Sequence, residues 1–308
     1  NMRAPGMTYM RMPLVIWSLF IVAILLLLAL PVLTSALALL LFDRMAGTSF
    51  FSPAGGGDPL LWQHLFWFLG HPEVYVLVVP AMGIVAEVIT NNARRPLWGY
   101  KSVALSTVFL GFCSFVVWAH HMYLTGMGTT VNAIFEVTTM IISVPSIIIM
   151  TCLLATLWGG SIRFTVPMLF ALAFLPMFGI GGFTGIPLAL ATSDLHLHDT
   201  YYVIGHFHYM IAPGTIFALF AGVYYWFPKF TGRQMNTLLG HLHFWPSLIC
   251  MNGIFFPMLI QGMAGVSRRL YDGGQGYAHA QDVLVLNKLM SYSAFALPAV
   301  QVFFIINA

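Results

Sequence analysis

Charged residues are scarce in this sequence. Only 7% of the 308 residues are Asp, Glu, Lys or Arg, whereas 59% are hydrophobic. A soluble domain of this size needs a more polar surface, so the composition excludes one and predicts a polytopic membrane protein. The net charge of +3 is small, and no nucleic-acid partner is expected.

Cysteine is equally scarce. Cys113, Cys152 and Cys250 stand alone in apolar segments, without the spacing of a disulfide or a metal site, and we expect them to be small core residues. The chain also lacks internal repeats, low-complexity tracts and glycine-rich phosphate loops. Its chemistry must therefore use other residues.

Long apolar runs dominate the chain instead. A helix needs about 20 apolar residues to cross a bilayer. Eight such runs lie at about residues 13–42, 72–93, 101–123, 133–158, 165–192, 201–227, 240–262 and 286–307. We therefore expect an all-α, polytopic transmembrane helix bundle of about eight spans, in a single domain covering residues 1–308. Pro31 interrupts the first run, which should tilt or kink.

Basic residues favour one side of the membrane when the loops are assigned alternately. With the N-terminus of this chain inside, eight of the 12 Lys and Arg residues lie in inner loops, and all Asp residues lie in outer loops. Since Lys and Arg concentrate on the cytoplasmic or matrix side, we expect that orientation. The pair Arg268-Arg269 lies outside, against the trend. A fixed anion is a sensible partner for it, and a solvated loop pair is the simpler alternative.

Histidine is frequent for so apolar a chain, with 11 copies. His206 and His208 lie two residues apart in one span and should point to nearly opposite faces, because side chains advance about 100° per helical residue. Histidine inside a membrane usually marks a ligand or a proton path, although a hydrogen-bonded core histidine is the simpler alternative. This helix should therefore offer an imidazole to each of two neighbours.

A second pattern is His71-Pro-Glu-Val-Tyr75. His71 and Tyr75 should share a face one turn apart. We expect Pro72 in the first turn of its helix, where its missing N–H costs nothing. Glu73 lies about 200° round from His71 and should face another cavity, where it could pass protons. The alternative is a glutamate stabilised by the dipole of the helix N-terminus.

A third pattern is Trp118-Ala-His-His121. Neighbouring side chains diverge on a regular helix, so His120 and His121 can serve one ion only where the helix is ending, which is where they lie. Together with His71 they would supply three neutral imidazoles from two helices. Such a trigonal nitrogen site suits copper or zinc.

These patterns, with Gly181-Gly-Phe-Thr-Gly185, His198-Asp-Thr-Tyr-Tyr202 and His206-Phe-His208, resemble the signature motifs of subunit I of the haem-copper oxidases. The resemblance is to the cytochrome c oxidase type whose second-helix motif contains glutamate. It covers essentially the whole chain and matches helices five to twelve of the family's twelve-helix core. It implies that four family helices lie outside these residues, either because the sequence is a fragment or because the gene is split.

The resemblance implies a catalytic centre. His71, His120 and His121 would bind the copper ion known as copper B. Tyr75, cross-linked to His71, would supply an electron and a proton to dioxygen. Glu73 would be the branching proton donor.

The resemblance also implies two haems, for which haem A is the expected type. His206 would be the proximal ligand of the high-spin haem, and His208 one of the two ligands of the low-spin haem. The remaining implied sites are an outer magnesium site at His198 and Asp199, and contacts to the haem propionates by Asp194, Arg268 and Arg269.

One expected proton carrier is missing. The family usually places a lysine three residues after the position of Ser146, where this chain has Ile149, and a serine at the position of Ala86. Isoleucine does not relay protons, so this second path is rerouted or closed. Glu87 is either part of a replacement or a charge at the inner interface.

The leading hypothesis is the core of a terminal respiratory oxidase that reduces dioxygen to water with proton uptake, and with proton pumping in question. Cytochrome c is the expected donor. The alternatives are a quinol oxidase, a nitric oxide reductase or a non-catalytic scaffold; Tyr75 favours oxygen chemistry. Expected partners are subunits II and III and a segment or chain supplying the first four helices with the second low-spin haem ligand. The expected location is a bacterial cytoplasmic or mitochondrial inner membrane.

Overall fold

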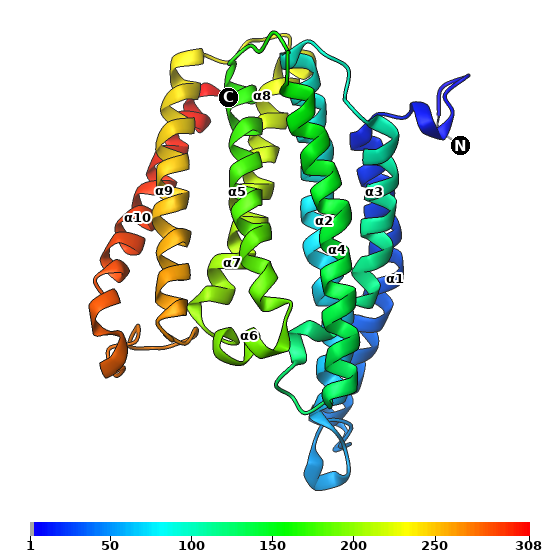
Figure 1. Ribbon diagram of the computed structural model, residues 1–308, viewed down its shortest axis with the longest axis vertical. Coiled ribbons are helices and arrows are strands. Elements are labelled where there is room, and N and C mark those ends of the chain that lie inside the picture. The colour runs from blue at the N-terminus through cyan, green and yellow to red at the C-terminus, as the bar shows by residue number, and fades with distance from the viewer. Residues whose placement is uncertain (1–2) are drawn as a thin grey trace. The chain divides into compact units, whose positions relative to one another are not determined.

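The computed structural model describes residues 3–308 (Figure 1). Within this part, eight helices are long and apolar enough to cross a membrane, and every regular element is helical. The prediction of an all-α membrane bundle is therefore confirmed. The helices are α1 (Leu14–Met45), α2 (Pro59–Ala93), α3 (Tyr100–Cys113), α4 (Thr129–Leu157), α5 (Val166–Leu188), α6 (Ala191–Leu197), α7 (Tyr201–Ile211), α8 (Phe217–Thr231), α9 (Thr237–Met263) and α10 (Leu286–Asn307).

The chain divides into two compact units. The first contains the chain up to Gly83, with Gly99–Thr151 and Ala189–Ala191. Here α1 packs against α3, and α2 approaches α1 so closely that a Cβ on Gly83 would lie 2.5 Å from the Ser18 hydroxyl oxygen. A glycine is needed at this crossing because any side chain would force the helices apart.

The second unit contains Ile84–Trp98, Cys152–Leu188 and Thr192–Ala308. In this unit α5 packs against α7 and α8, α9 packs against α7, and α10 runs along α9 (Figure 1). The histidine-bearing helix α7 is thus held between α5 and α9.

One proline lies deeper inside its helix than the sequence suggested. We expected Pro72 in the first turn of its helix, but α2 begins at Pro59, so that expectation was wrong. Pro31 lies inside α1, as the span predicted at about 13–42 had placed it. Membrane helices tolerate internal proline because neighbouring helices and local adjustment satisfy the freed carbonyl groups. The apolar run therefore marked the membrane-embedded part of α2 rather than its full length.

Two irregular stretches lie beside the histidine motifs. The regular helix α3 ends at Cys113, and a 3₁₀ turn from Trp118 to Met122 carries His120 and His121. This confirms that the two histidines lie where the helix ends. The span of His206 and His208 also changes, because a π turn at Ala212–Ile216 separates α7 from α8. Pro213 explains that turn, since it lacks the N–H needed to continue the α-helical pattern.

Candidate metal centre and histidine sites

Three histidines converge in the first unit. Nδ1 of His71 lies 3.3 Å from Nε2 of His121, which lies 3.2 Å from Nε2 of His120. One ligand nitrogen from each ring lies within 4.8 Å of the other two. Three nitrogens held about 2.0 Å from one metal ion would be about 3.5 Å apart. The spacing and the neutral nitrogen donors therefore fit a single small metal ion.

Two neighbours orient these rings. The hydroxyl oxygen of Thr139 on α4 lies 2.9 Å from Nδ1 of His120, which leaves Nε2 to face the cluster. The indole of Trp67 stacks on the ring of His121 at 3.9 Å between centroids. A hydrogen bond to the second ring nitrogen fixes the tautomer and direction of a metal-binding histidine.

The sequence did not single out Thr139. It stands beside Thr138 in an apolar span, and both hydroxyls donate to the carbonyl oxygen of Phe135. Only the three-dimensional structure shows that one of them also reaches a histidine. Trp67 also fits the pattern of the family that the sequence resembles, in a supporting role that the sequence does not separate from packing.

Tyr75 and Glu73 point in different directions, as their spacing predicted. Tyr75 is buried, with its ring centroid 5.0 Å from that of His71. Glu73 is exposed and lines an apolar cleft of about 230 Å³, formed with leucines of α1 that include Leu26 and Leu30. Only Tyr75 therefore lies beside the three-histidine cluster.

His206 and His208 face different helices of the second unit. Nδ1 of His206 lies 2.8 Å from the carbonyl oxygen of Gly181 on α5. The ring of His208 stacks on Phe255 of α9 with 4.5 Å between centroids, and its Nδ1 lies 2.8 Å from the carbonyl oxygen of Ile204. In both rings Nδ1 donates to a carbonyl, which leaves Nε2 as the ligand atom. The prediction of two imidazoles on opposite faces is confirmed.

A cluster of ionised groups lies where α6 meets the loop after α9. His198 contacts Asp194 at 3.2 Å and Asp199 at 3.8 Å, and Arg268 contacts Asp199 at 2.5 Å. Arg269 is more exposed and lies 3.8 Å from Asp199. We call these five residues the Asp199 cluster. Sequence reasoning divided them between two sites, and the structure shows them in contact.

The charges of this cluster shift the pKa of its members. A hydrogen bond with Asp194 raises the pKa of His198, which outweighs the opposing effect of burial. Partial burial raises the pKa of Asp199, but Arg268, His198 and Arg269 together lower it more, so the pKa ends below its ordinary value. Asp199 also adopts a left-handed φ of 54°, which aspartate tolerates better than most residues.

Three further positions, Ala86, Ile149 and Glu136, lie within the helices. Ala86 and Ile149, where the resemblance led us to look for a serine and a lysine, are both buried. Glu136 was not singled out. Its carboxylate accepts a hydrogen bond of 2.6 Å from the backbone N–H of Ala191 and so holds the start of α6 within the first unit.

The fold and these sites define a class of protein: a helical membrane protein with three histidines that could hold a metal ion and two further histidines on opposite faces of one helix. The chain belongs to the family described as "Cytochrome C and Quinol oxidase polypeptide I", which it matches over residues 1–296.

Two curated relatives are both named cytochrome c oxidase subunit 1. The protein from Cereibacter sphaeroides is 48% identical over 295 residues, which cover 96% of this chain and 52% of the relative. The protein from Bacillus sp. (strain PS3) is 46% identical over 307 residues, which cover 100% of this chain and 49% of the relative. The chain thus spans about half the length of the curated relatives that it matches.

A solved structure supports the fold. The chain resembles one from a cryo-EM study of a heme-copper terminal oxidase dimer, with a TM-score of 0.82 and 22% identity. The likeness covers 96% of this chain and 56% of the other.

Proposed function

We propose that this chain forms part of the catalytic core of a terminal respiratory oxidase that reduces dioxygen to water, with cytochrome c as the electron donor. One observation carries the proposal: three histidine nitrogens converge at metal-ligand spacing beside a buried tyrosine. The printed names of the two curated relatives support the choice of donor.

His71, His120 and His121 hold copper in this proposal, and His206 and His208 hold one haem iron each. When bound, these metals supply the electrons and the site where dioxygen binds. The neutral imidazoles suit that donor set. The hydrogen bond between Nδ1 of His206 and Gly181 keeps Nε2 free for the haem iron.

The protein's own acid groups supply protons. Tyr75, buried one helical turn from His71, donates the proton of its phenol oxygen and one electron. Glu73 lies on the opposite side of α2 at an apolar cleft and delivers further protons to the centre.

The Asp199 cluster serves two ligands in this proposal. His198 and Asp199 hold magnesium, and Asp194, Arg268 and Arg269 lie by the haem propionates. Two adjacent arginines on the side that otherwise carries the acidic groups support an anionic partner, because guanidinium pairs well with carboxylate. Haem A is the proposed haem.

The chain works in an assembly. We place it in a bacterial cytoplasmic or mitochondrial inner membrane, with its N-terminus on the inner side and with subunits II and III as partners. A further segment or chain supplies four more helices and the second ligand of the haem held by His208. The support is that the curated relatives are about twice as long as this chain.

The central test is His120→Ala in the assembled oxidase. We expect the variant to lose copper and oxygen consumption but to keep the low-spin haem spectrum, because His208 belongs to the other site. His279→Ala, in an exposed loop, is the matched control and should retain copper and activity. Copper binding or oxygen reduction retained in His120→Ala would rule out the assignment.

A further inference from the structure

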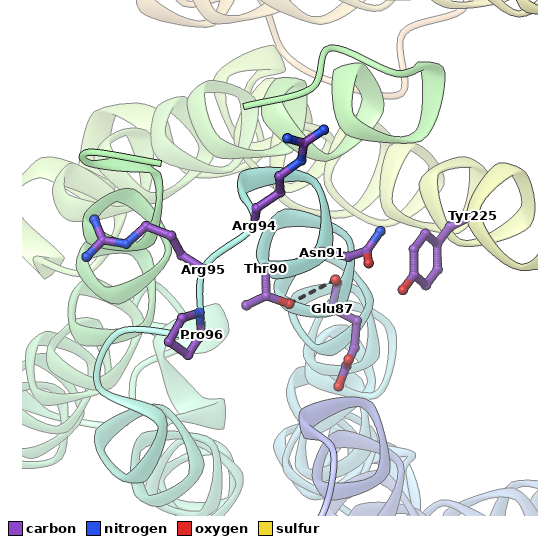
Figure 2. A pocket seen from close by; sticks show the side chains of 7 residues that line it. All are labelled: Glu87, Thr90, Asn91, Arg94, Arg95, Pro96 and Tyr225. Atoms are coloured by element: carbon purple, nitrogen blue, oxygen red, sulfur yellow. Dashed lines mark hydrogen bonds between the residues drawn. The ribbon is translucent and has the colours of Figure 1, made fainter. Parts of the chain in front are cut away.

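A polar pocket opens at the end of α2 that carries two arginines. It has a volume of about 470 Å³ and lies within the second unit, between α2 and α8. Its lining residues are Glu87, Thr90, Asn91, Arg94, Arg95, Pro96 and Tyr225. Figure 2 shows the two arginine side chains extending away from Glu87, and Asn91 facing Tyr225 across the pocket.

Glu87 lies deepest along the helix among the α2 residues of this pocket. It precedes Arg94 by two turns, which is about 10 Å of helix. Acidic side chains are costly inside membrane spans and usually mark a functional path. Glu87 lines the pocket and is half-buried, so it lies in the membrane span and is partly accessible to solvent.

The charges of the pocket limit what it can hold. Glu87 is the one carboxylate among its lining residues, and Arg94 and Arg95 oppose a metal cation. Across the pocket, the Lys229 ammonium lies 4.5 Å from the ring centroid of Tyr225 and adds a third positive charge nearby. An anion entering to the depth of Glu87 would meet the negative carboxylate. Water, being neutral, is repelled neither by the arginines nor by the carboxylate of Glu87, so we expect water to occupy the pocket.

We propose that Glu87 is the proton-collecting group on the inner side of the oxidase. This inference rests on the proposed function and adds the residue at which protons leave the water. The ionised carboxylate accepts a proton from a hydronium ion or a buffer acid in the pocket, which becomes water or the buffer base. The neutral acid then passes that proton to a water molecule on its membrane side, which becomes hydronium, and returns to the carboxylate.

The test uses the assembled oxidase carrying Glu87→Gln, which keeps the shape of the side chain but carries no exchangeable acid proton. We expect turnover to fall on the order of tenfold or more. The loss should grow with rising pH, since uptake then depends on the scarcer hydronium ions of the bulk water. Glu87→Asp restores an acid group and should recover most of the rate.

A second variant tests access to the pocket without altering the acid. Asn91 is exposed at its wall, and Asn91→Trp would fill the space that leads to Glu87. We expect it to slow turnover in the same pH-dependent way. Gln234→Trp places the same ring on the exposed loop after α8 and should leave the rate unchanged.

Haem and copper content, measured in every variant, separates the two proposals. If the unmodified complex lacks the metals, the proposed function fails and this inference fails with it. If the complex is active and Glu87→Gln and Asn91→Trp keep its rate and pH profile, only the inference is overturned. Should Glu87→Gln not assemble, Asn91→Trp decides alone, and an unchanged rate again overturns it.

Discussion

Thr139 and Thr138 are adjacent on α4 and make the same backbone hydrogen bond, yet only Thr139 reaches His120. We predict that Thr139→Val lowers copper affinity about 10- to 100-fold, because the imidazole loses the partner that fixes its direction. Copper retained after dialysis against a chelator measures the effect. Thr138→Val removes an equivalent hydroxyl and should bind copper as the unmodified oxidase does. Equal copper loss in both variants would contradict a specific role for Thr139.

At the residue scale, ligands could be predicted from the sequence better than the groups that orient them. His71, His120 and His121 stood out because histidine is rare in apolar spans and their spacing limited which faces they could share. Thr139 gave no such signal, and Trp67 was predicted only as part of the resemblance, without a role distinct from packing. Their roles depend on which helix lies opposite, and a single sequence does not contain that information.

At the scale of helices, the position of the His206 ring of α7 depends on a small residue of α5. A Cβ on Gly185 would lie 2.8 Å from Cε1 of His206, closer than atoms pack without displacement. We predict that Gly185→Ala tilts the His206 ring and lowers the affinity for the high-spin haem about fivefold or more, since overpacking costs about 1 kcal/mol or more. The carbon monoxide difference spectrum measures this haem.

Gly182 provides the matched control on the same helix. A Cβ there would meet nothing within 4 Å. Gly182→Ala should therefore keep full haem occupancy. If Gly185→Ala also keeps the full carbon monoxide signal, His206 does not depend on this close approach.

The Asp199 cluster links α6 to the loop after α9 in a way that should depend on pH. The pKa of Asp199 is lowered on folding, so its stabilisation is present above about pH 4 and is lost as the pH falls through the lowered folded value. The pKa of His198 is raised, so its contribution is present below about pH 6.5 and is lost as the pH rises through the raised value. The link should be firmest between these limits.

Hydrogen exchange in metal-free oxidase checks this window. The backbone N–H of Arg268 donates to the carbonyl oxygen of Asp199 at 2.9 Å. Its protection against exchange should weaken both below and above this pH window, after correction for the intrinsic exchange rate at each pH. The amide of Gly274 donates to Asp272, whose pKa is lowered by backbone hydrogen bonds from Gly274 and Gly276. The protection of the Gly274 amide against exchange should weaken only at acidic pH. Protection of Arg268 that does not change with pH would contradict the prediction.

The helices themselves were largely predictable, because eight apolar runs of membrane length allow few alternatives. The residues at which the helices begin and end were less predictable. The stretch from Pro59 to Gly70 precedes the predicted span at 72–93, and it continues α2 without a break although it contains Gln63 and His64. The π turn after α7 depends on how Pro213 is accommodated between packed helices.

At the scale of the whole molecule, orientation in the membrane can be tested directly. Cys113, Cys152 and Cys250 are all buried, so an impermeant thiol reagent should meet little background. We predict that Ala54→Cys, in the exposed loop after α1, reacts from outside in sealed cells. Gln234→Cys, exposed after α8 near Lys229 and Arg233, should react only after permeabilisation, because basic loops stay inside.

The same labelling experiment bears on the Glu87 pocket. The loop after α2 and the loop after α8 are separated by an even number of spans, so the pocket opens on the side where Gln234→Cys reacts. Labelling of Gln234→Cys from outside, with Ala54→Cys protected, would reverse the orientation and place Glu87 on the side away from inner water. Protons consumed with dioxygen would then have to come from a different residue, because a carboxylate collects protons only from the water that it contacts.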